Sequence, residues 1–172
     1  MNLLRVVGLP FLLLASFHAA AIEEGDISFP TSASLPPDTM QALRAWPESG
    51  KYALRSDINP YFIQGDFNGD DRIDTAVLVT EKSTGKKGIA VVHGPGAIYL
   101  LGAGHDVDDR GDDYSWLDAW YTFPRGGVEQ GMGEDAAPPV LSGDALMVMK
   151  TESASALIYW SGTGYRWYQQ GD

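Results

Sequence analysis

Short apolar runs that alternate with clusters of turn-forming residues occupy most of the chain after residue 60. β-Branched and aromatic side chains dominate the runs, and Gly, Pro, Asn, Asp and Ser fill the gaps, which is the pattern of strands joined by tight turns. No helical segments alternate with the runs, so we expect an antiparallel meander rather than a parallel sheet. The expected strands cover residues 61–63, 75–80, 89–93, 97–101, 116–123, 145–150, 156–160 and 165–169.

One segment before the strands has helical character. Pro36 and Pro37 suit the start of a helix, since proline is tolerated in the first turn. Apolar side chains then recur with a period near 3.6 residues, at Leu35, Met40, Leu43 and Trp46. The sequence therefore predicts a mainly β protein with one short N-terminal helix, its antiparallel meander forming a sheet, a sandwich or a partial propeller.

The first 21 residues have the features of a secretory signal peptide. Arg5 supplies the positive charge, an apolar run follows from residue 6 to 17, and Ala19, Ala20 and Ala21 form a small-residue cleavage site. The run is too short to span a bilayer. We expect cleavage after Ala21 and export to a bacterial periplasm or medium. The expected organisation is a signal peptide (1–21), an extended lead-in with a short helix (22–50) and a β domain (51–172).

Charge and cysteine content exclude several function classes. The 172 residues hold 23 acidic and 12 basic side chains, with a formal charge of −11, and no cysteine. Such a chain lacks the positive surface that nucleic acids or anionic membranes require. It cannot form disulfides, zinc–thiolate sites or a cysteine nucleophile. An exported chain without disulfides needs a sufficient core or another stabilising element.

An acidic segment between two expected strands is the strongest chemical signal. Oxygen-bearing side chains occur at every second position, at Asp66, Asn68 and Asp70, and again at Asp74. The backbone carbonyl of Arg72 lies between the last two. Calcium prefers six to eight such oxygen ligands in a tight loop. The spacing favours a Ca²⁺ site made of these five residues. The alternative is a hairpin turn with a solvated acidic face.

This segment resembles the calcium loops of FG-GAP/VCBS-type repeats, which are hairpin insertions in propeller blades. The resemblance covers residues 63–79. It is not an EF-hand, because Val77 stands where the bidentate glutamate would be. Asp71 occupies a position with positive φ where such loops usually have glycine, and aspartate tolerates this conformation at some cost. Phe67 and Ile73 lie where we expect the loop to anchor itself to the core.

A second acidic segment and an aromatic run follow. Residues 106–113 hold five acids whose spacing fits no metal template, so a solvated loop is favoured over a second cation site. Trp116 and Trp120 come directly afterwards, together with Phe123. They are candidates to line a binding groove, although core packing is the favoured interpretation.

The C-terminal hairpin carries a candidate partner-binding turn. Ser161, Gly162 and Tyr165 form an S-G-x-x-Y pattern that resembles the inhibitory loop of periplasmic lysozyme inhibitors. The resemblance implies a lysozyme-like protein partner, or an immunity role against a muramidase, and an acidic surface would attract a basic lysozyme. The alternative is an ordinary hairpin stabilised by cross-strand aromatic pairs.

No motif for catalysis is present. The chain has no G-x-S-x-G, no Walker motif and no histidine pair at zinc-ligand spacing. We therefore expect an exported calcium-binding protein that acts as a non-catalytic binding or structural module. A lysozyme inhibitor is the first alternative. The second is a hydrolase of cell-wall glycan using carboxylates among Glu129, Glu134 and Asp135, or a module that binds such material.

Overall fold

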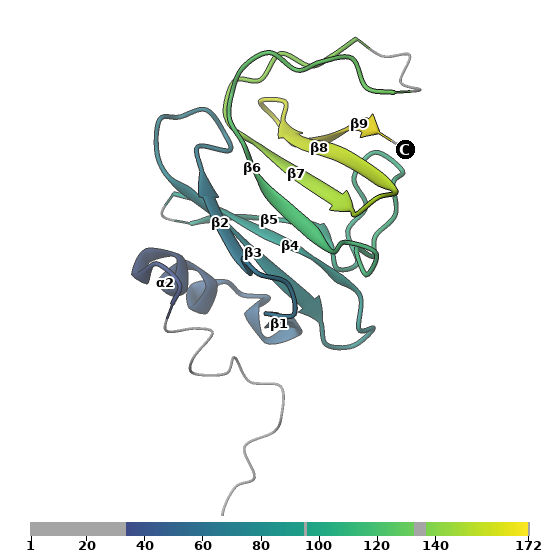
Figure 1. Cartoon of the computed structure of the whole chain (residues 1–172). Coiled ribbons are helices and arrows are strands. Elements are labelled where there is room, and N and C mark those ends of the chain that lie inside the picture. Colours follow the sequence, from purple (N-terminus) through teal and green to yellow (C-terminus); the bar gives the residue numbers. More distant parts are fainter. Residues whose placement is uncertain (1–33, 95, 133–136, 172) are drawn as a thin grey trace, which may run out of the picture.

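Two antiparallel sheets packed face to face make up the protein (Figure 1). The computed structural model describes residues 34–94, 96–132 and 137–171, so the predicted signal peptide and most of the lead-in lie outside the described residues. The elements are α2 (Pro37–Ala45), the 3₁₀ turn η1 (Ser49–Lys51), β1 (Tyr52–Leu54), β2 (Phe62–Gly65), β3 (Asp74–Glu81), β4 (Lys87–His93), β5 (Ala97–Gly102), β6 (Ala119–Phe123), β7 (Ala145–Lys150), β8 (Ala154–Trp160) and β9 (Tyr165–Gly171).

The first sheet is ordered β1-β3-β4-β5, and β2 also pairs with β3. β2 lies beside the beginning of β3, where Gly65 pairs with Asp74, and β1 lies beside its end, where Tyr52 pairs with Glu81. β3 is buried on both faces over most of its length. This explains why it appears in the sequence as a continuous apolar run instead of an alternating one.

The second sheet is a meander in the order β6-β7-β8-β9. Every neighbouring pair is antiparallel; the β7–β8 and β8–β9 connections are short turns, whereas residues 124–144 join β6 to β7. The predicted mainly β, antiparallel class is confirmed, in the form of two stacked sheets. The predicted helix is also confirmed, with its N-terminus at Pro37.

Three apolar layers hold these elements together. The central layer lies between the sheets, where Leu78 and Ile89 of the first sheet meet Leu146 and Ile158 of the second, all fully buried. A second layer lies between α2 and the outer face of the first sheet, and a third covers the outer face of the second sheet. Both faces of both sheets are therefore covered over part of their area.

The structure differs from the predicted strands most in two places, and elsewhere the bounds shift by at most two residues. β1 was not expected, because three residues are too few to show an alternating pattern. The strand expected over 116–123 begins only at Ala119, because Trp116 lies in a turn closed by the bond from the Leu117 amide to the Tyr114 carbonyl (3.1 Å). Within the described ranges, no helix is long and apolar enough to cross a membrane.

Candidate functional site

The segment from Asp66 to Asp74, here called the acidic loop, connects β2 to β3. Phe67 is 0% exposed and lies in the layer between the sheets, as the sequence predicted. Ile73 was expected to be a second anchor, and this was wrong, since it is 65% exposed. The reason is that the next residue, Asp74, takes the inward position and contacts the backbone of the loop.

Asp66 organises the first half of the loop. Its Oδ1 accepts hydrogen bonds from the amides of Gly69 (2.8 Å) and Asp70 (2.9 Å), and its Oδ2 accepts one from the amide of Asp71 (3.0 Å). Asp71 has φ = 62°, so the left-handed conformation expected at this position is confirmed. A single buried carboxylate thus accepts three backbone amides, of which that of Asp70 also donates to Asn68 Oδ1 (3.1 Å).

Asp74 organises the second half of the loop and is 0% exposed. Its Oδ2 accepts hydrogen bonds from the amides of Phe67 (3.0 Å) and Asn68 (3.3 Å), and its Oδ1 accepts one from Gly94 (3.0 Å) after β4. Burial raises the pKa of Asp74, and these three amides act in the opposite direction. Asp74 therefore ties the acidic loop to the neighbouring β4–β5 turn.

The remaining predicted ligands lie at the rim of the loop. The Asn68 side chain donates to Asp70 Oδ2 (3.2 Å), and Asp70 Oδ1 accepts the amide of Arg72 (2.9 Å). Asp70 and Arg72 are exposed. The structure thus brings Asn68 and Asp70 into contact and leaves the Asp70 carboxylate without an ion pair among the described residues.

Residues of the connection between β6 and β7 clamp the acidic loop. Arg125, after β6, donates from Nη2 to Asp66 (3.1 Å) and Asp71 (2.9 Å). Asp144, before β7, accepts the Asp66 amide (2.9 Å) and the Arg125 amide (2.9 Å), and its own amide donates to the Asp66 carbonyl (2.6 Å). A side chain at Gly143 would collide with the Asp66 carbonyl and the Gly69 amide. The β6–β7 connection therefore fits closely over the loop.

Sequence reasoning missed these clamp residues. Gly143 and Asp144 have the composition of any turn, and Arg125 lies in a long irregular segment without periodicity. Their contacts span 54 to 78 residues along the chain. The only available signal was the excess of acids in the loop, which requires positive charge from somewhere in the fold.

The oxygen atoms of the loop are of the type that a hard cation binds, but their positions suit such a cation less well. Carboxylate and amide oxygens are the ligands that calcium prefers. However, the described ranges contain no group of three or more Asp, Glu, His or Cys side chains placed to hold a metal ion. Asp66 and Asp74 accept backbone amides, and Arg125 supplies positive charge to Asp66 and Asp71. A cation bound at Asp70 and Asn68 would therefore compete with Arg125 for Asp66.

The predicted partner-binding turn lies in the β8–β9 hairpin, but its tyrosine faces inward. The Tyr165 hydroxyl is 2.6 Å from His93 Nε2, and the Tyr165 ring contacts Tyr99 and Trp160. Burial raises the pKa of Tyr165 well above its usual range. Ser161 and Gly162 are exposed, and Ser161 Oγ donates to the Gly164 carbonyl (2.8 Å). Tyr165 therefore links the two sheets through His93.

The two tryptophans that were predicted to lie in a groove or in the core have different environments in the structure. Trp120 is 4% exposed and its indole donates to the Pro60 carbonyl (2.6 Å), so core packing is confirmed there. Trp116 is half-buried and packs edge-on against Trp167, with ring centroids 6.0 Å apart. These two indoles line an aromatic groove of about 380 Å³, whose other members include Arg110, Lys150, Ser155 and Gln169.

The second acidic segment ties together neighbouring elements. Asp108 pairs with Arg166 (2.7 Å) and accepts the Trp167 amide (2.9 Å) on β9. Asp113 accepts a hydrogen bond from the Lys87 amide on β4 (2.9 Å), and this bond lowers the pKa of Asp113. These contacts account for two of its acids without a metal ion.

Comparison of the chain with protein-family models, with curated proteins and with solved structures gave no match.

Replacing Arg125 with Gln should lower the melting temperature in the absence of divalent cations, because Asp66 and Asp71 lose their positive partner. The decrease in melting temperature should be smaller at high salt, because the exposed Arg125–Asp71 pair is then screened. Thermal unfolding followed by circular dichroism measures this, with Arg72→Gln as the control, because Arg72 forms no ion pair within the described residues. Equal melting temperatures for the two variants would contradict the clamp.

Stability should depend on His93 in mildly acidic solution. Burial lowers the pKa of His93, while the charges of Asp70 and Asp66 act in the opposite direction. The unfolded chain therefore binds the proton first, and the free energy of unfolding should fall as pH drops below about 6.5 toward the folded-state pKa. Urea unfolding between about pH 5.5 and 7.5 measures this slope, which should weaken in His93→Gln. An unchanged slope in the variant would assign the pH dependence to other groups.

Proposed function

We propose that this protein is an exported, non-catalytic binding module whose acidic loop holds a calcium ion as a stabilising element. The observation that carries this proposal is the position of Asp70. Its carboxylate lies at the exposed rim, contacts Asn68, and has no ion pair among the described residues, whereas Asp66 and Asp71 share Arg125. An oxygen-rich rim with uncompensated negative charge is suited to a hard cation.

The rest of the loop supports this assignment. Asp71 already has the positive φ that calcium loops of the FG-GAP/VCBS type need, and the amides around Asp66 hold the turn in shape. Calcium, when bound, supplies positive charge at the rim. The chain has no cysteine, so an ion would provide the stabilisation that many exported domains obtain from disulfides.

The central experiment is thermal unfolding in calcium, in magnesium and in EDTA. With a dissociation constant of about 10 μM and about 1 mM free calcium, the expected gain is roughly 2.7 kcal/mol. Asp70→Asn should remove this gain, because the amide can still accept the Arg72 hydrogen bond but lacks the charge. Superimposed curves for the wild-type protein in all three solutions would contradict the proposal.

Asp71→Asn is the matched control for Asp70→Asn. Both substitutions remove one exposed negative charge from the same loop, and asparagine tolerates the left-handed conformation of residue 71. Asp71 is not among the proposed ligands, so its variant should retain the calcium-dependent rise in melting temperature. Loss of the rise in both variants would indicate a diffuse charge effect instead of a site.

A second candidate function is binding of cell-wall glycan at the aromatic groove. Two indoles with nearby hydroxyl, amide and basic groups can pack against sugar rings and hydrogen-bond to their hydroxyls. In this second candidate, the contact with the glycan is made by Trp116 instead of Ser161, Gly162, Tyr165 or Trp120. The lysozyme-inhibitor alternative gains no support from Tyr165, whose hydroxyl contacts His93. For a glycan hydrolase, Glu134 and Asp135 lie outside the described residues.

Co-sedimentation with insoluble peptidoglycan tests the second candidate. Trp116→Ala should reduce the bound fraction, because the groove loses one aromatic wall, while Tyr121→Ala, which removes an exposed aromatic elsewhere, should not. Equal sedimentation of both variants and the wild-type protein would reject binding through this groove.

A further inference from the structure

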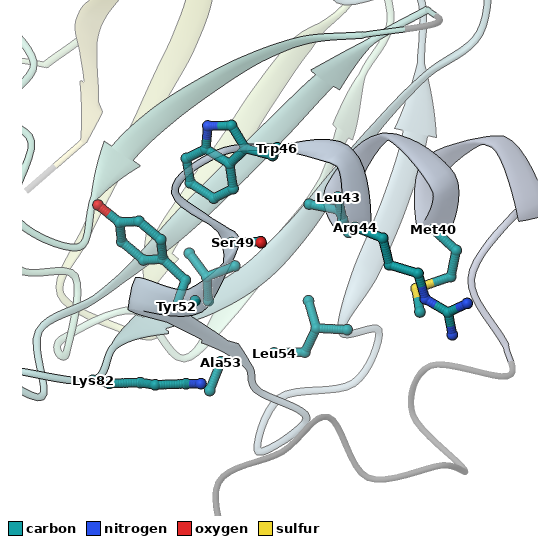
Figure 2. Close-up of a pocket in the computed structure, with 11 residues that line it drawn as sticks. Met40, Leu43, Arg44, Trp46, Ser49, Tyr52, Ala53, Leu54 and Lys82 are labelled. Atoms are coloured by element: carbon teal, nitrogen blue, oxygen red, sulfur yellow. The ribbon is translucent and has the colours of Figure 1, made fainter.

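A separate groove of about 250 Å³ lies between α2, η1 and β1, and is here called the α2 groove (Figure 2). Its lining residues Val79 and Lys82 lie near the end of β3 and just after it, whereas the acidic loop ends at Asp74, where β3 begins. Apolar side chains line most of the α2 groove: Met40, Leu43, Trp46, Tyr52, Leu54 and Val79. The rings of Trp46 and Tyr52 stack against each other, with their centroids 5.0 Å apart.

The charged residues of the α2 groove are both basic. Arg44 and Lys82 lie on opposite sides of the apolar group in Figure 2. Most lysines and arginines in the described part of this acidic chain form ion pairs, and the exceptions are Arg44, Arg72, Lys82 and Arg110. Two exposed bases without acidic partners beside an apolar surface favour a ligand that combines an apolar body with negative charge.

We propose that the α2 groove binds a monomeric anionic amphiphile, a single aliphatic chain ending in a carboxylate. The chain covers the side chains of Leu43, Leu54 and Trp46, and the carboxylate pairs with Lys82 or Arg44. The volume of the groove, about 250 Å³, suits one short aliphatic chain better than the two chains of a phospholipid. The partly buried state of Trp46 and Leu54 means that the ligand removes further apolar area from water.

Isothermal titration of the whole exported chain with dodecanoate, below its micelle-forming concentration, tests this proposal. We expect binding of one molecule, no binding of acetate, which lacks the chain, and weaker binding of dodecyltrimethylammonium, which carries the opposite charge. The double variant Arg44→Gln/Lys82→Gln should bind dodecanoate about tenfold more weakly, because the carboxylate loses its basic partners.

The double variant Arg72→Gln/Arg110→Gln is the matched control. It removes the same total charge from two other exposed bases without ion pairs, and it should bind dodecanoate as the wild-type protein does. Equally weak binding of dodecanoate by both double variants would show that net charge alone controls binding. That result would overturn the proposed site.

Three further outcomes would also overturn the proposal. Dodecanoate fails to bind, or the cationic amphiphile binds equally well, or the protein binds anionic phospholipid vesicles but not dodecanoate. Sedimentation of the free protein adds a check, since a dimer whose formation prevents dodecanoate from binding would assign the groove to a second copy of the chain. Calcium binding at the acidic loop is measured independently, so neither result depends on the other.

Discussion

Three backbone hydrogen bonds and an ion pair meet at the carboxylate of Asp66, and they hold the acidic loop in place. The carboxylate faces the amides of its own loop and the Arg125 side chain of the β6–β7 connection, while the Asp66 backbone bonds to Asp144. One residue thus fixes the shape of the acidic loop and its position against the β6–β7 connection. Burying a carboxylate costs free energy unless it is hydrogen-bonded and paired with a positive charge. The loss of any one of these partners would therefore destabilise the buried Asp66 carboxylate.

A second link between the sheets runs through His93 and Tyr165. The acidic loop, the β4–β5 turn and the β8–β9 hairpin are therefore joined by contacts from Asp74 to Gly94, and from His93 to Tyr165. Low local dielectric strengthens these hydrogen bonds and increases the cost of losing one partner. The polar contacts specify how the sheets are aligned, while the apolar layer between them supplies most of the stabilisation.

The sequence was sufficient for most of the strands, because strand burial leaves a local pattern. The mainly β class and the helix beginning at Pro37 follow from such local signals, whereas the left-handed conformation of Asp71 was implied by the resemblance to FG-GAP/VCBS-type loops. β1 carried too short a pattern to be seen. Arg125 and Asp144 could not be predicted, since their roles depend on contacts more than fifty residues away along the chain. Ile73 was misplaced because the inward position goes to a buried charged residue, which hydrophobic patterning does not anticipate.

Carboxylate–amide hydrogen bonds and Arg125 hold the acidic loop in shape before any ion binds. Amide hydrogen exchange in EDTA tests this most directly at Gly69, Asp70 and Asp71, whose amides Asp66 accepts. We expect protection of these three amides close to that of β3 amides. Rapid exchange of the loop while β3 stays protected would contradict it and show that the loop needs an ion to become ordered.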